Sequence, residues 1–262
     1  MGTTNGFPLR SLLSASEGGQ DPDTYWRASL AGCESMPFPP MPSGAHAQQS
    51  TAPATLEHHC ALPPVPQASS YAYPSTLVHA AWAILSTRYT NVHEAVFGVA
   101  GAAQNAAGNG SRLTVVPLRI PVTDSQTARD YLAAVQQQAI GMVSYAHIGL
   151  KQIASLSADA SYACDFQTLL LMQLDDDDKA NANAPLTPDN TPYPLTLQCV
   201  PTQHGLRVVA TFNPSIIEPW LVEKMLGQFD YAMQQLAAAD KDTTSMPRLE
   251  SRHVPVTLHF RA

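Results

Sequence analysis

The feature that most constrains the fold of this chain is an uncharged run that begins after Asp165 and ends before Asp175. Residues 169–172 of this run are all apolar, which is typical of a strand buried on both faces of a sheet. A second run, residues 113–122, predicts a companion strand, in which Pro117 has no N–H and indicates a bulge or an unpaired position. The chain is therefore expected to be an α/β domain built around a central buried strand.

The composition excludes several classes of partner. Charged residues make up 13% of the 262 residues, the net charge is −7 and there is no basic cluster, which argues against nucleic acid or an anionic membrane as partner. No apolar run approaches the roughly 18 residues that span a bilayer, and the first residues lack the features of a signal peptide. The four cysteines show no C-x-x-C spacing. We therefore expect reduced thiols in a cytoplasmic protein.

Helical spacing of apolar residues alternates with short strand-like runs. Asp21, Pro22 and Gly32 bound a short helix, since aspartate caps a helix, proline fits its first turn and glycine ends it. Thr127 and Asp130 resemble a capping box that opens a helix to about residue 144. Further strands are expected over 55–62, 94–100, 194–200 and 206–212, and further helices over 74–89, 148–156 and 219–238. This order predicts a mixed β-sheet flanked by helices.

Composition also divides the chain into segments. Residues 1–20, rich in Gly and Ser, are expected to form a flexible N-terminus, and residues 241–262 a polar tail with a candidate edge strand over 254–258. One domain is expected between them, over residues 21–240. Two of its parts are expected to be irregular, the proline-rich wrap 33–53 and the acidic, Asn/Pro-rich loop 175–192.

Few residues indicate a chemistry by themselves. His58 and His59 are adjacent on a predicted strand, so their side chains point to opposite faces and cannot both line one site. The acidic tract 175–178 is typical of a solvated loop rather than of a cation site. The small-residue loop 101–110 lacks a G-x-G-x-x-G pattern, and no G-x-S-x-G pattern occurs. We therefore expect no metal and no cofactor.

His147 lies at a predicted turn between two helices. No acid partner is visible near it, which favours a capping or packing histidine. The alternative is a histidine that donates or accepts a proton during a reaction.

Five stretches stand out together: the Tyr-Trp…Leu-Ala-Gly helix 23–32, the helix start 74–83, the Val-Pro-Leu-Arg strand end 116–119, the His-Ile-Gly-Leu turn 147–150, and the Cys-Asp-Phe-Gln-Thr-Leu stretch 164–169. In this order and spacing they resemble the C-terminal half of a condensation domain from fungal nonribosomal peptide synthetases. The resemblance covers roughly residues 21–238. It implies a single chloramphenicol-acetyltransferase-like lobe, one of the two that form the family's active-site tunnel.

The departures from the family pattern concern its catalytic residues. The family's H-H-x-x-x-D-G motif lies in the other lobe, so we expect a truncated chain without it. His58 and His59 are followed by Cys60, Ala61 and Leu62, and the motif's aspartate and glycine are absent. The family's asparagine before the arginine strand corresponds to Thr114, and the segment between residues 97 and 113 is shorter than its counterpart. The usual histidine-dependent condensation cannot be carried over.

Two classes of function remain open. The first is a standalone enzyme of fungal secondary metabolism that assists cyclisation, a pericyclic reaction, dimerisation or release of a peptide-derived or carrier-bound intermediate. Orientation in a dry cleft can supply about 7–11 kcal/mol towards such steps. The second is a non-catalytic accessory or docking module of a synthetase, or a decayed synthetase fragment.

The resemblance also indicates a site and partners. The family's arginine in this strand is associated with holding the active-site region together, and without the missing aspartate Arg119 needs another anion. Solvent, an acid of this chain, and a ligand or partner are the three alternatives. We expect an open cleft edge with Arg119 and Thr114 on one wall as substrate-binding residues, and Arg119 and His147 in catalytic roles. An exposed lobe face predicts a homodimer or a complex with a synthetase.

Overall fold

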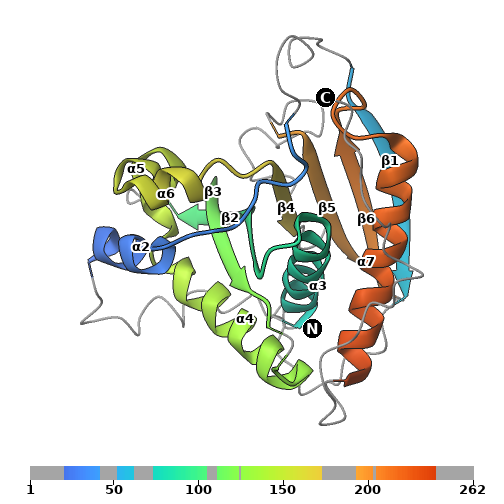
Figure 1. The fold of residues 1–262 in the computed structure, drawn as a ribbon, viewed down its shortest axis with the longest axis horizontal. Coiled ribbons are helices and arrows are strands. Elements are labelled where there is room, and N and C mark those ends of the chain that lie inside the picture. Colours follow the sequence, from blue (N-terminus) through green and yellow to red (C-terminus); the bar gives the residue numbers. More distant parts are fainter. Residues whose placement is uncertain are drawn as a thin grey trace, which may run out of the picture.

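The computed structural model describes residues 21–41, 52–61, 73–104, 111–123, 125–172, 193–202 and 205–239. They form a six-stranded mixed sheet in the order β1-β6-β5-β4-β2-β3, with helices packed against it (Figure 1). The strands are β1 (Ala54–Ala61), β2 (Glu94–Gln104), β3 (Ser111–Pro121), β4 (Thr168–Met172), β5 (Leu195–Thr202) and β6 (Gly205–Phe212).

β4 is the strand predicted from the uncharged run, and it lies in the interior of the sheet. It runs parallel to β2 on one side and to β5 on the other, whereas the other pairs are antiparallel. Leu169 and Leu170 are at most 1% exposed although they point to opposite faces. Burial on both faces explains why this strand carries no charge.

The hairpin of β2 and β3 differs from the prediction. We expected a loop over 101–110, but β2 continues to Gln104 and β3 begins at Ser111. Small residues favour no particular structure, and pairing with the opposite strand extends the ladder. The register is continuous through the Gly98–Pro117 pair, so the predicted bulge is absent. β3 is an edge strand of the sheet, where a residue without an N–H is tolerated.

Two long helices cover the sheet, α3 (Tyr73–Thr90) and α7 (Pro219–Ala239). They pack against each other, and α7 also packs on β1 while α3 packs on β2 (Figure 1). Every residue of α3 from Thr76 to Thr87 is buried. The rings of Trp82 and Phe229 meet edge to face at 6.1 Å between centroids, in the centre of this layer.

A second group of helices lies beside the β2–β3 hairpin: α2 (Pro22–Leu30), α4 (Ala128–Val143), the 3-10 turn η2 (Ala146–Ile148), α5 (Gly149–Ser155) and α6 (Ala158–Ala163). The predicted caps are confirmed. Asp21 accepts from the backbone N–H of Thr24, and Thr127 accepts from that of Asp130. Sequence reasoning missed α6, a six-residue helix capped by Ser157, because so short a helix has little periodicity.

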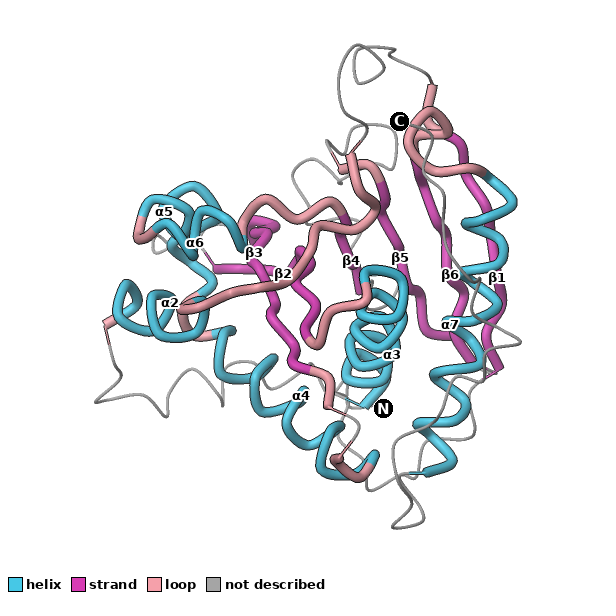
Figure 2. Tube along the Cα trace, viewed as in Figure 1, coloured by secondary structure: helices cyan, strands magenta, loops and turns pink. Residues whose placement is uncertain are grey.

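The segment 31–41, here called the strap, leaves α2 and crosses the sheet as an irregular chain (Figures 1 and 2). The carbonyl of Phe38 accepts from the Thr168 hydroxyl at 2.6 Å, and the carbonyl of Ser35 accepts from the Tyr162 hydroxyl at 2.7 Å. These contacts fix the strap near the start of β4, although it has no regular structure of its own.

Several sequence predictions lie outside the described residues: the N-terminus 1–20, the loop 175–192, the tail 241–262 and residues 42–51 of the proline-rich wrap. Within the described part of the chain, no helix is both long and apolar enough to cross a membrane.

Candidate functional site

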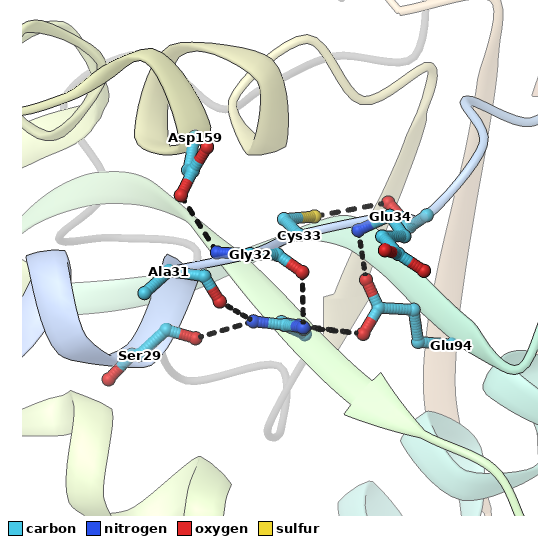
Figure 3. Close-up of polar contacts among 9 residues, drawn as sticks. Ser29, Ala31, Gly32, Cys33, Glu34, Glu94 and Asp159 are labelled. Carbon is cyan, nitrogen blue, oxygen red and sulfur yellow. Dashed lines mark hydrogen bonds and ion pairs between the residues drawn. The ribbon is translucent and has the colours of Figure 1, made fainter.

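Arg119, near the end of β3, is the most highly connected polar side chain of the predicted site. Its guanidinium donates to the carbonyls of Ala31 at 2.7 Å, Gly32 at 3.1 Å and Ser29 at 3.5 Å. It also donates twice to Oε2 of Glu94, at 2.9 and 2.7 Å. Figure 3 shows these carbonyls and Glu94 around one centre. Arg119 therefore joins the C-terminal end of α2 to the β2–β3 hairpin.

Glu94 supplies the anion that Arg119 required. It begins β2, and Arg119 lies across the ladder opposite Val96, so the two side chains are diagonal neighbours on one face. The side chains of Arg119 and Glu94 are 19% and 12% exposed. Solvent, an acid of this chain, and a ligand or partner were the three alternatives for Arg119, and the structure shows the second, an ion pair with Glu94. The expected open cleft edge at Arg119 is therefore not found, because the guanidinium is already enclosed.

The helix α2 is held by further contacts from three sides. The indole N–H of Trp26 donates to the Tyr145 carbonyl at 3.0 Å, and the Tyr25 and Tyr145 rings stack at 4.2 Å between centroids. Arg27 donates to the carbonyl of Leu156. At the start of the strap, the N–H of Gly32 donates to Asp159 at 2.7 Å (Figure 3). The strap thus starts from a rigid anchor.

Glu94 and Asp159 were not recognised from the sequence. The signal for Glu94 was its place at the start of a strand that pairs with the Arg119 strand, because such a register brings the two side chains together. No comparable signal exists for Asp159, since it lies 127 residues from its partner, Gly32.

Thr114 does not share a wall with Arg119. Both residues are on β3, whose ladder with β2 is unbroken, and they are five positions apart. Side chains alternate along a strand, so an odd separation places these two on opposite faces. The predicted pairing of Thr114 with Arg119 was wrong for this reason.

His147 is exposed and lies in η2, which packs against β2 and β3. Its Nδ1 is 3.1 Å from the carbonyl of Ser144. Among the described residues, no carboxylate forms an ion pair with its ring, and it makes no hydrogen bond with Arg119. Arg119 and the η2 region meet α2 at different points, since Trp26 binds Tyr145, two residues before His147.

His58 and His59 point to opposite faces, as predicted. Nε2 of His58 lies 3.5 Å from Oδ2 of Asp230 on α7, whereas Nε2 of His59 lies 3.0 Å from Oε1 of Glu57 on the outer face. They therefore do not form one site. Across the described ranges, no three His, Cys, Asp or Glu side chains are placed to hold a metal ion.

Burial shifts the pKa values of His79 and of three cysteines. Burial lowers the pKa of His79 to about 4, and burial raises the pKa of Cys199 and of Cys164 to about 12. The pKa of the Cys60 thiol is also raised, chiefly by burial and then by the nearby Asp230 carboxylate. A raised thiol pKa disfavours the thiolate, so these three cysteines are poor nucleophiles.

An open hollow of about 640 Å³ lies beside α5 and α6. Its lining residues are Leu150, Lys151, Ala154, Ala158, Ser161, Tyr162, Cys164 and Asp165. Tyr162 also binds the strap through Ser35, so the hollow and the strap are neighbours. Sequence reasoning missed this feature because it depends on α6.

Comparison with protein families matches residues 10–252 to the condensation domain. The chain is 38% identical over 235 residues to the nonribosomal peptide synthetase TES of Alternaria alternata, covering 85% of this chain and 4% of the synthetase. It is 35% identical over 258 residues to the nonribosomal peptide synthetase dtxS1 of Metarhizium robertsii, covering 89% of this chain and 3% of the synthetase. The chain thus spans a small part of these curated relatives.

Solved structures share the fold. The starter condensation domain of rhizomide synthetase RzmA matches with a TM-score of 0.56 and 17% identity, over 91% of this chain and 54% of that chain. A four-domain nonribosomal peptide synthetase bound to AMP and glycine matches with a TM-score of 0.61 and 13% identity, over 84% of this chain and 19% of that chain. The family match covers most of the sequence, and the sheet and helices agree with it. The chain therefore belongs to the condensation-domain family.

Proposed function

We propose that this protein acts in the fungal biosynthesis of a nonribosomal peptide or polyketide–peptide, by binding and orienting a peptide-derived or carrier-bound intermediate. The reaction class is cyclisation, a pericyclic step, dimerisation or release. The observation that carries the proposal is the 38% identity to a fungal nonribosomal peptide synthetase over 85% of the chain. Steps of this class need orientation more than covalent chemistry.

In this proposal Arg119 is a positioning residue. Its bonds to Glu94 and to the carbonyls of Ala31 and Gly32 hold α2 and the strap against the hairpin. His147, exposed in η2, is the proton donor or acceptor. Thr114 is assigned to substrate binding on the opposite face of β3, separately from Arg119.

The test incubates the purified protein with the pathway's peptide intermediate and measures the rate and ratio of products. We expect a faster reaction than in buffer, and a loss of activity in His147→Ala. His59→Ala is the matched control, because His59 is also exposed and lies on β1, at the other edge of the sheet from β3. Product rates equal to those in buffer would reject the enzymatic proposal, and full activity of His147→Ala would reject the assigned role.

Arg119 is tested separately. Arg119→Lys keeps the charge but loses the forked geometry, and Arg119→Ala loses both. A positioning role predicts that Arg119→Ala lowers substrate affinity and rate together, with partial recovery in Arg119→Lys. Unchanged kinetics in a folded Arg119→Ala variant would contradict the role.

The second candidate function is a non-catalytic module that docks on a synthetase. It is favoured by the lack of an acid partner for His147 in the described residues, and by six exposed large apolar side chains. These are Met36, Met41, Ile140, Val143, Tyr162 and Trp220. Light scattering of the protein alone and with the synthetase separates the cases: a stable complex without any change in products supports docking.

A further inference from the structure

The two edges of the sheet are built differently. β3 carries Pro117 and Pro121, which have no N–H to offer a further strand. β1 contains no proline, glycine or lysine, and its ladder with β6 runs without a bulge from Ala54 to Ala61. Among the described residues no strand pairs with the outer side of β1. Thus the β1 edge has neither the prolines of β3 nor a bulge to prevent pairing with another chain.

The outer face of β1 carries a carboxylate and an imidazole in a self-complementary order. Glu57 and His59 are 46% and 70% exposed, and Oε1 of Glu57 lies 3.0 Å from Nε2 of His59. Arg207 on β6 lies 3.6 Å from Oε2 of the same carboxylate. On the opposite face, Leu56 and His58 are half-buried and Cys60 is buried.

We propose that β1 pairs antiparallel with β1 of a second copy of this chain, about a two-fold axis at His58. In an antiparallel pair, directly opposite residues lie on the same face. Pairing centred on His58 sets Glu57 of one copy against His59 of the other, twice. It also sets Leu56 against Cys60 on the inner face. The result is a continuous twelve-stranded sheet across the dimer.

Neighbouring registers are less favourable. A centre at Glu57 places two glutamates directly opposite each other, and a centre at His59 places Glu57 against Ala61. Neither sets Glu57 against His59, whereas the His58 centre does so twice and places the two His58 side chains opposite each other. If one strand slips by a single residue along the other, inward side chains lie opposite outward ones, so the two faces no longer match. The two Glu57–His59 contacts and the alternation of side chains therefore select the His58 centre, and an isologous contact closes as a dimer.

This pairing names the edge through which two copies of the chain associate, and it can fail separately from the proposed function. A monomer that still forms product would overturn the β1 pairing and leave the proposed function standing.

The test is sedimentation velocity from about 1 to about 100 µM protein, the range in which modest interfaces associate. We expect a reversible dimer. His59→Glu sets two glutamates against each other at both positions. We therefore expect about ten-fold weaker association, so that the dimer forms only at about ten-fold higher protein concentration. The double variant Glu57→Lys with His59→Glu sets opposite charges against each other and should recover dimerisation. His93→Glu, a charge change at an exposed histidine away from β1, should leave it unchanged.

Hydrogen exchange of the wild type provides a second measurement that needs no variant. Amides of residues 54–61 should become more protected as protein concentration rises, while those of β3 should not. A monomer at all concentrations, a dimer indifferent to His59→Glu, or concentration-dependent protection away from β1 would each overturn the proposal.

Discussion

At the residue scale, Gly98 in β2 allows a close approach that no other residue permits. A Cβ at this position would lie 2.2 Å from Cε2 of Phe166, which is 4% exposed and stacks on Tyr193 at 5.3 Å between centroids. We expect Gly98→Ala to lower the free energy of unfolding by about 1–3 kcal/mol, since the ring must move within a packed core. Urea denaturation measures this.

Gly227→Ala is the control for that substitution. Gly227 lies within α7, and a Cβ there would meet nothing within 4 Å. Alanine should stabilise this helix position by about 0.5–1 kcal/mol. Equal effects of the two substitutions would show that the Phe166 contact does not limit position 98.

Also at the residue scale, His79 should make stability depend on pH. Burial lowers its pKa from 6.5 to about 4, its side chain is 7% exposed, and its Nδ1 has no partner within the described structure. Below pH 6.5 the unfolded chain binds a proton that the folded chain does not. The free energy of unfolding therefore keeps its full value, as far as His79 is concerned, above pH 6.5. It falls by up to about 3 kcal/mol as the pH falls towards 4.

Urea denaturation at about pH 7 and about pH 4.5 should detect this loss. His79→Leu removes the titrating group, so the difference between the two pH values should shrink by about 2 kcal/mol. An unchanged difference in His79→Leu would assign the pH dependence to other groups.

At the element scale, the anchoring of α2 depends on Arg119. Removing the guanidinium leaves Glu94 without a counter-ion and the carbonyls of Ala31 and Gly32 without a donor. We expect Arg119→Ala to cost about 3 kcal/mol and to free α2 and the strap locally. Hydrogen exchange should show faster exchange over residues 25–35, and a double-mutant cycle with Glu94→Ala should give a coupling above about 0.5 kcal/mol. Additive effects would mean that the pair does not act as a unit.

At the scale of the whole molecule, the two groups of helices should unfold together. Trp26 and Leu30 of α2 belong to the same contiguous core as Trp82 of α3 and Phe229 of α7. A shared core predicts one cooperative transition, with coincident midpoints by tryptophan fluorescence and by far-UV circular dichroism. Separate midpoints would indicate that α2 and its neighbours form an independent unit.

Local patterns in the sequence determined most of the elements of this protein. The uncharged run at 166–174 identified β4, and the caps at Asp21 and Thr127 identified α2 and α4, because burial and capping depend on residues close together in the chain. The family was also evident, since its five stretches keep their order and spacing. Short or small-residue segments such as α6 and the end of β2 were missed, because neighbours in space rather than local preference determine them.

The candidate site was decided by the tertiary structure. The sequence identified Arg119 and its need for an anion, but it did not show which of several acidic residues would pair with it. Only the register of β2 with β3 brings Glu94 beside Arg119. The carbonyls of Ala31 and Gly32 reach the same guanidinium only because the end of α2 lies against the β2–β3 hairpin. The same register separates Thr114 from Arg119 by placing them on opposite faces of one strand. Contacts between distant residues follow from how strands pair, and that pairing is a property of the folded chain.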